Sequence, residues 1–399
     1  MNLRRISVKS VLLIVYSTIL LALLILPHYK YSVTYMVIIL ASAPFVFAYA
    51  ICDLHILRKI GFIFVWLAII ALLRFMWNTP FYISGAVNTS IILYLCILAY
   101  FIFEILMMRD NRREIFWVIV ITCFMLALIG FNTFREFASN PTVARLLANG
   151  TTEDEYINLL RSKNVGGFGF SYCIGMLTPY IAMRVARAKW KNKIPGILLL
   201  GLLLVFIFYT QYTTLLLLSV FFTACAFVTK SNNMIFKITF LIIFAIVLLE
   251  LKDIFLYLTI HVKLENLASH FNDLYIMMTS GKSSSSRTEL YGNAFALFLK
   301  NPILGADLTD ASNAYIVNHA HSTFFGMLAG GGIVGTGIYY GIFFKVIKNI
   351  KSALGDIKDI FPVFIMFFVL SFLNPVSHFE INIVVFMLIP LFEYKYKKG

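Results

Sequence analysis

The fold is decided by residues 194–229, which read IPGILLLGLLLVFIFYTQYTTLLLLSVFFTACAFVT. Two apolar runs, each about 17 residues long, flank a short polar turn at 210–212, and the whole segment contains no acidic or basic residue. An α-helix needs about 20 mostly apolar residues to cross the roughly 30 Å hydrocarbon layer of a bilayer. Because backbone groups find no water partner in lipid, such runs must be helical. We therefore expect a helical hairpin that crosses a membrane twice.

The rest of the chain has the same character. Hydrophobic residues make up 60% of the 399 residues, charged residues only 13%, and the mean hydropathy is +0.87. A soluble domain is about one quarter charged, so this chain lacks the polar surface that water requires. We expect an all-α fold: one polytopic transmembrane domain over residues 1–399, with about twelve spans. The expected spans are 11–26, 33–52, 60–77, 86–107, 115–131, 166–183, 194–209, 213–229, 235–250, 323–344, 360–373 and 381–393.

The net charge of +14 is distributed in a way that indicates topology. Segments that remain in the cytoplasm carry an excess of Lys and Arg close to the spans. With the spans given above, 22 of the 33 basic residues lie on the side that holds both termini, and the others lie on the opposite side. We therefore predict cytoplasmic termini. Since topology explains most of the charge, the lipid bilayer is an expected partner and nucleic acid is not.

Two segments between spans are much longer than a connection requires. They cover residues 132–165 and 251–322, and both fall on the side opposite the termini, which makes them extracytoplasmic loops in this prediction. Loops of this length usually carry function. In the second loop, apolar residues recur at helical spacing between positions 264 and 278, which predicts an amphipathic helix at the membrane surface. A second short helix is expected over 288–299, ended by the Asn301-Pro302 pair.

The second loop also holds the most informative polar residues. His319 and His321 lie where this loop enters the span 323–344, and Arg287 opens a short helix about thirty residues earlier. The glycines that follow His321 allow close helix packing, but packing does not explain an imidazole at the mouth of a helix. Three other histidines on the outer side are expected to be ordinary surface residues: His28, His261 and His270.

These residues resemble a known family pattern. Arg287, the turn Asn301-Pro-Ile-Leu-Gly305, then His321-Ser322 followed after nine residues by Gly332-Ile-Val-Gly335-Thr336, are similar to the O-antigen polymerase and ligase superfamily. The glycine-aromatic segment 164–172 resembles one found in Wzy-type polymerases. One feature departs from the family. Many members carry a Ser-Arg pair in the turn between the seventh and eighth spans, where this chain has Tyr209-Thr-Gln-Tyr212.

The resemblance implies a glycosyltransferase of the bacterial cytoplasmic membrane whose active site faces outside. Its donor would be an undecaprenyl-pyrophosphate-linked oligosaccharide, and a chain-length regulator protein is a candidate partner. No cofactor is implied, and the acidic residues of the outer loops lack the spacing of metal ligands, so we expect metal-independent transfer.

Such a reaction needs a cationic clamp for the diphosphate and a base for the acceptor hydroxyl. We assign the clamp to Arg287 and the base to His321, with His319 as the fallback. Secondary candidates for diphosphate or glycan binding are Arg161, Lys163, Arg145 and Tyr291.

Three functions remain open on these grounds. They are a polymerase of O-antigen or capsule repeat units, a ligase that transfers glycan to lipid A core or another acceptor, and a polysaccharide flippase. A carrier usually shows repeat-related halves and ionisable residues near mid-bilayer. Here Arg74, Glu104 and Glu250 lie toward helix ends, and the polar residues concentrate in the outer loops. The missing Ser-Arg pair weakens the ligase interpretation, so the polymerase is our preferred prediction.

Overall fold

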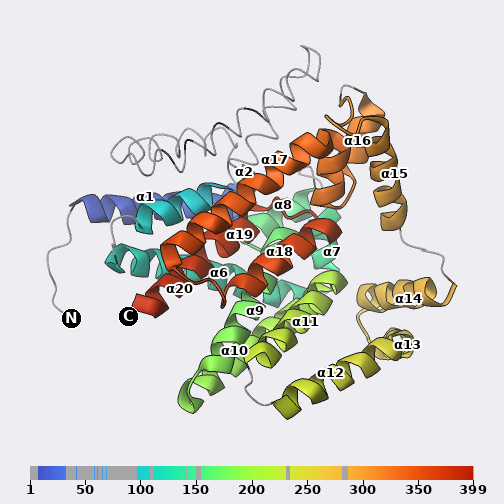
Figure 1. Cartoon of the computed structure of the whole chain (residues 1–399), viewed down its shortest axis with the longest axis horizontal. Coiled ribbons are helices and arrows are strands. Elements are labelled where there is room, and N and C mark those ends of the chain that lie inside the picture. Colours follow the sequence, from blue (N-terminus) through green and yellow to red (C-terminus); the bar gives the residue numbers. More distant parts are fainter. Residues whose placement is uncertain are drawn as a thin grey trace.

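The computed structural model describes residues 8–32, 97–107, 112–140, 142–149, 154–230, 234–280, 286–308 and 310–398, and positions 42, 58, 61, 65 and 69. Within these residues every regular element is a helix (Figure 1), which confirms the all-α prediction. Most of the expected spans 33–52 and 60–77, and the first half of 86–107, lie outside the described residues. The number of twelve crossings therefore stays a prediction.

The helices follow one another along the chain in three groups. The first group is α1 (Val8–Ile25), α2 (Pro27–Ser32), α6 (Arg112–Ser139), α7 (Val143–Asn149) and α8 (Glu155–Ser162). The second is α9 (Phe168–Arg187), α10 (Trp190–Thr210), α11 (Thr213–Lys230), α12 (Met234–Leu249), α13 (Leu251–His261) and α14 (Glu265–Ser280). The third is α15 (Ser286–Lys300), α16 (Ala311–Asn318), α17 (Thr323–Leu354), α18 (Phe361–Leu373), α19 (Phe379–Ile383), η2 (Val384–Leu388) and α20 (Ile389–Lys398).

Among the described residues, four helices are long and apolar enough to cross a membrane. They are α6, the part Lys193–Thr210 of α10, α11 and α17. Four shorter apolar helices cover Ser10–Ile25, Ile97–Met107, Lys237–Leu249 and Phe361–Leu373. All eight fall on expected spans, and the opening hairpin of α10 and α11 forms as predicted. The remaining expected spans, 166–183 and 381–393, are helical as α9 and as the run from α19 to α20.

Helix α9 lies at the centre of the bundle (Figure 1), where it contacts α10, α11, α18 and α19. Lipid is as apolar as leucine, so close packing, and not transfer out of water, must hold such helices together. Gly175 shows how close the approach is, because a Cβ at this position would lie 2.3 Å from a methyl carbon of Leu215 on α11. Aromatic side chains such as Phe343, Phe367 and Phe386 fill the core between α17, α18 and η2.

Acidic residues anchor one end of α9 by ion pairs. Asp359, whose side chain is 3% exposed, accepts from Arg187 and lies 3.7 Å from Arg184 and 3.2 Å from Lys230. Glu393 on α20 also pairs with Arg184. These three basic residues belong to the set that the sequence places on the side of the termini. Their convergence agrees with that grouping, while the orientation of the bundle in a membrane stays a prediction.

The long segments between spans contain the helices that were expected, and additional ones. Helix α14 covers the amphipathic stretch predicted over 264–278, and buries Leu267 and Phe271 against Phe255 of α13. Helix α15 covers the stretch predicted over 288–299. Helix α13 was not expected. In the segment 132–165, α6 continues to Ser139 before α7 and α8 begin.

Candidate functional site

The glycine-rich part of α17 contains a sharp kink. Gly332 adopts φ +60° and ψ −164°, a conformation open only to glycine. A Cβ at this position would lie 2.3 Å from the carbonyl oxygen of Ile303, because the turn 301–305 occupies the kink. The amide of Ile333 donates to the carbonyl of Pro302 (2.9 Å), and the amide of Val334 donates to that of Ile303 (3.1 Å). The kink thus exposes two helical amides, and the turn satisfies both.

Further hydrogen bonds complete this junction between turn and helix. The Ala306 amide donates to the Ala329 carbonyl (2.8 Å), an acceptor that the kink has freed, and Thr336 Oγ1 donates to the Gly332 carbonyl (2.6 Å). Gly305 has φ +85°, and a Cβ there would lie 2.5 Å from the backbone of α17. The Asn-Pro-Ile-Leu-Gly turn and the Gly-x-x-Gly-Thr pattern therefore share one structural explanation. Together they fix the end of α15 against α17.

His321 lies directly before α17 in an unusual backbone conformation, with φ +50°. Such a conformation costs a non-glycine residue of the order of 1–3 kcal/mol, and the surrounding contacts must compensate. Ser322 caps α17 by accepting from the Phe325 amide (3.2 Å), and its hydroxyl donates to the Ser371 carbonyl (3.1 Å). Thr323 Oγ1 accepts from the Val376 amide (2.8 Å). The chain that follows His321 is therefore held rigidly, and the exposed imidazole stands at the mouth of the helix.

The charges of two arginines and a second histidine act on His321. Partial desolvation, and then the charges of Arg287, His319 and Arg145, lower the pKa of His321 below its usual value. Partial desolvation, Arg145 and Arg287 lower the pKa of His270 in the same way, while Asp273 opposes the shift. Both arginines thus act on both histidines. We call Arg145, His270, Arg287 and His321, which come from α7, α14, α15 and the start of α17, the cationic cluster.

The cationic cluster includes three residues that the sequence singled out and one that it did not. Arg145, Arg287 and His321 were candidates, whereas His270 was expected to be an ordinary surface residue. The available signal was its place on the amphipathic helix of the loop that also carries Arg287. When such a helix packs against the other helices, a histidine on it can come close to residues that are distant in the sequence.

The other candidates have contacts of their own. His319 ends α16, where its Nδ1 lies 2.9 Å from the Tyr315 carbonyl and its ring stacks on Tyr315 at 4.0 Å. These contacts hold the His319 ring in place, and its charge also acts on His321. Arg161 is buried on α8, and Lys163 ends the same helix with its side chain exposed. Neither is among the charges that act on His321.

Tyr291 helps to dock α15. Its hydroxyl donates to the Leu373 carbonyl (2.8 Å), and its ring stacks on Phe325 of α17 at 5.1 Å. Burial raises the pKa of Tyr291, and the charge of Arg287 partly offsets this increase. Tyr291 therefore lies close to the predicted clamp and also braces the helix that carries it.

Aromatic side chains lie next to the cationic cluster. Phe168 stacks on Tyr172 at 4.1 Å, and Tyr212 packs edge-on against Phe168 at 5.3 Å. The charge of Arg287 acts on Tyr172, and the Tyr212 hydroxyl donates to the Ala144 carbonyl (2.9 Å), directly before Arg145. This aromatic group therefore joins the glycine-aromatic segment 164–172 to the turn that departs from the family pattern.

A buried group of polar residues, Lys30, His378 and Glu380, lies next to the aromatic group. Lys30 and Glu380 form an ion pair of 2.6 Å, with side chains 6% and 5% exposed. His378 lies between this pair and Phe168, with ring centroids 5.2 Å apart, and burial lowers its pKa to about 4. Gly169 permits this arrangement, because a Cβ there would lie 2.9 Å from His378. At neutral pH the His378 imidazole is therefore uncharged.

The O-antigen ligase family model matches residues 174–340. No curated protein matches the chain. The matched region begins in α9, ends in α17, and contains His270, Arg287, His321 and the glycine kink. It therefore covers the elements that build most of the cationic cluster. In this region, and in the residues around His321 that first indicated it, the chain is similar to the O-antigen ligase family.

Proposed function

We propose that this protein is a polysaccharide polymerase of the cytoplasmic membrane. It would transfer a growing glycan from undecaprenyl pyrophosphate to a sugar hydroxyl of another lipid-linked repeat unit. The observation that carries this proposal is the cationic cluster, in which two arginines from distant segments lower the pKa of the same two histidines. Two arginines that both act on the same two histidines favour the binding of an anion at this place.

The arginines suit a diphosphate. Arginine presents planar N–H donors that bind phosphate oxygens in pairs and stays charged in a partly dry site. In our proposal Arg287 holds the diphosphate, and Arg145 supplies the second positive charge.

His321 would accept the proton of the acceptor hydroxyl. Its lowered pKa keeps the imidazole neutral at pH 7, so it can act as a base. The hydroxyl oxygen attacks the anomeric carbon of the donor glycan, the bond from this carbon to the diphosphate oxygen breaks, and the proton passes to His321. The diphosphate leaves with the bonding electrons, and the two arginines stabilise its charge. General-base catalysis of this kind contributes about 10²- to 10⁴-fold.

Donor binding would also strengthen the base. The charges of Arg287 and Arg145 lower the pKa of His321, and a bound diphosphate would offset those charges. The pKa of His321 then rises toward neutrality, where a general base is most effective. The site would thus become a better base when the donor is in place.

A ligase is the second candidate, because the matching family model is described as O-antigen ligase. The turn between α10 and α11 argues against it. This turn holds Gln211 at φ +58° and two tyrosines, and it contains no arginine. The two functions differ only in the acceptor, so the acceptor is what must be tested.

A reconstituted assay separates them. The purified protein receives a lipid-linked repeat unit, with or without lipid A core as a competing acceptor, and no metal or cofactor is added. We expect ladders of lengthening glycan from the repeat unit alone. His321→Ala should leave little product, and the matched control His319→Ala should retain most activity. Glycan found only on lipid A core would establish the ligase, and normal ladders from His321→Ala would remove the base from the proposal.

The orientation is proposed on the same basis. The termini would be cytoplasmic and the cationic cluster would face outside, where a chain-length regulator protein could contact it. A cysteine introduced by Ser284→Cys should react with a membrane-impermeant reagent in intact cells. Labelling that requires lysis would reverse the orientation.

A further inference from the structure

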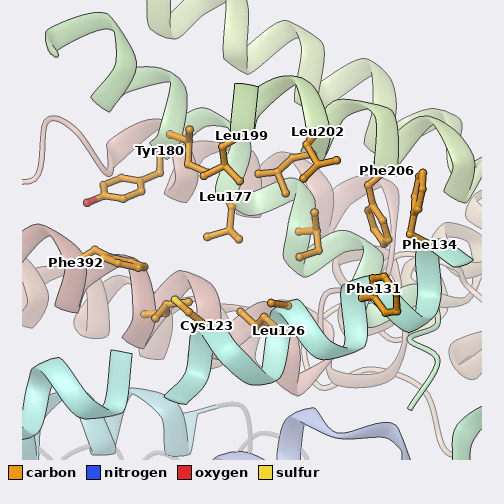
Figure 2. A pocket seen from close by; sticks show the side chains of 16 residues that line it. Cys123, Leu126, Phe131, Phe134, Leu177, Tyr180, Leu199, Leu202, Phe206 and Phe392 are labelled. Carbon is orange, nitrogen blue, oxygen red and sulfur yellow. The ribbon is translucent and has the colours of Figure 1, made fainter. Parts of the chain in front are cut away.

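An apolar cavity of about 560 Å³ lies between α6, α9 and α10, with one wall completed by Leu388 and Phe392 (Figure 2). Apart from the thiol of Cys123 and the hydroxyl of Tyr180, its lining side chains are hydrocarbon. Protein pockets of about 300–1,000 Å³ hold small molecules. An unpaired charge would be strongly disfavoured here, so any occupant must be a hydrocarbon chain or ring.

The cavity is elongated and opens sideways. On α6 its lining runs from Cys123 to Phe134, which corresponds to about 16 Å of helix at 1.5 Å per residue, or about half the hydrocarbon layer. Phe392 and Tyr180 lie at one end of the view in Figure 2, and Phe134 lies at the other. The lining residues Phe131 and Leu202 are 69% and 60% exposed. A slot open between α6 and α10 is accessible to a chain that arrives from the bilayer.

One end of the cavity leads to the cationic cluster. The ring of Phe134 meets that of Tyr209 edge-on at 5.5 Å. Tyr209 packs in turn against the small core that contains Val143 and Ala144 of α7. Arg145 follows Ala144 directly. The cavity therefore ends where α7 presents a charge of the cationic cluster.

We propose that this cavity binds the isoprenoid chain of the lipid-linked substrate, next to its diphosphate. The inference rests on the proposed function and adds the place of the lipid. The observation that selects this occupant is an apolar slot whose Phe134 end leads through Tyr209 to the helix that carries Arg145, which matches a hydrocarbon chain attached directly to a diphosphate. At the other end Arg184 is already paired with Glu393 and Asp359. An acyl chain of a phospholipid would also fill the slot, but it is joined through glycerol to a single phosphate, which carries less negative charge than a diphosphate.

Photo-crosslinking tests this without any transfer reaction. The full-length protein in lipid nanodiscs receives either a prenyl diphosphate with a diazirine in its chain or a phosphatidylglycerol with a diazirine in an acyl chain. We expect the prenyl probe to label peptides of α6 and α10 within 123–134 and 199–206, and unlabelled prenyl diphosphate to compete. Labelling elsewhere would overturn the proposal. Equal labelling by phosphatidylglycerol that prenyl diphosphate does not displace would also overturn it, by making the cavity an ordinary lipid site.

A matched pair of variants sharpens the test. Leu203→Trp on α10 fills part of the cavity, whereas Leu198→Trp places the same ring on the same helix at a position that is 68% exposed and outside the lining. We expect Leu203→Trp to weaken binding of the prenyl probe about tenfold or more and Leu198→Trp to leave it unchanged. Ala127→Phe, which fills the slot from α6, should repeat the effect if Leu203→Trp fails to fold. Equal binding by both filled variants and the control would refute the proposal.

The two proposals can fail separately. If the prenyl probe labels the cavity but no glycan is polymerised, the polymerase function is wrong and the lipid site stands. If glycan is polymerised while the probe labels another part of the chain, the lipid site is wrong and the polymerase function stands.

Discussion

Replacing Gly332 by alanine tests whether the turn-and-kink junction holds the site together. The added Cβ would lie 2.3 Å from the Ile303 carbonyl oxygen and 2.6 Å from the Gly305 amide nitrogen. Both are backbone atoms, so no side-chain rotation can relieve the clash, and the turn must move away. Three backbone hydrogen bonds would then be lost, which are those of the Ile333, Val334 and Ala306 amides.

The expected cost follows from these losses. Backbone strain at a conformation reserved for glycine is of the order of 1–3 kcal/mol. With about 1 kcal/mol for each of three hydrogen bonds, Gly332→Ala should destabilise the junction by about 4–6 kcal/mol. Since 1.4 kcal/mol is a factor of ten, the three amides should exchange with solvent more than about a hundredfold faster. Transfer activity should fall as well, because Arg287 and His321 would lose their common frame.

Amide hydrogen exchange followed by mass spectrometry measures this directly, on peptides that cover 301–306 and 329–336. The matched control is Gly337→Ala in the same helix, where a Cβ meets no atom within 4 Å. Alanine is favoured over glycine in a helix by about 1 kcal/mol, so this control should be at least as protected as the parent. Equal protection and equal activity in the two variants would show that the kink does not depend on glycine, and would refute the reasoning.

Three further outcomes are expected. Arg287→Lys should abolish polymer formation although the protein accumulates, because lysine keeps the charge without the paired donors; normal glycan ladders would exclude Arg287 from the clamp. The pH profile of kcat/KM, which reports the free enzyme, should fall only below the usual histidine range, because His321 must be neutral and its pKa is lowered. Arg145→Gln should raise the pKa of His321 and move this acidic fall in activity to higher pH. An unchanged pH profile would show that Arg145 does not act on the site. Lys30→Met should lower the stability measured by thermal unfolding by about 3–5 kcal/mol, because it leaves the Glu380 carboxylate buried without its partner. The double variant Lys30→Met/Glu380→Gln should recover most of this loss. Equal stability of the single and double variants would show that the pair is not coupled.

The helices could be predicted from the sequence because membrane insertion depends on local composition. A run such as 213–229 has no alternative to a helix in lipid, and α11 forms over almost the same residues. The amphipathic period of α14 is equally local. The break at Gly332 could not be predicted in this way, because its cause is the turn 301–305, which approaches only in the folded chain.

The residues of the candidate site also differ in whether local sequence could predict them. Arg287 and His321 were predicted from residue type and spacing within one loop, together with the family resemblance. His270 and the Lys30–Glu380 pair were missed because their meaning depends on partners that folding brings together, in the latter case across 350 positions. The aromatic group had a local signal in the segment 164–172. The contact of Phe168 with Tyr212 had no local signal, because Tyr212 belongs to a turn that was noted only for its missing arginine.

The junction between the turn 301–305 and α17 also constrains how this chain can vary through evolution and engineering. Neither half is complete alone: the kink without its turn exposes two amides, and the turn without the kink meets a continuous helix. A recombination breakpoint between residues 306 and 329 would combine halves shaped for different partners. Chimeras with proteins that match the same family model should therefore tolerate breakpoints before Ser286 or after Leu354. The smallest unit that can be exchanged intact is the segment from α15 through α17.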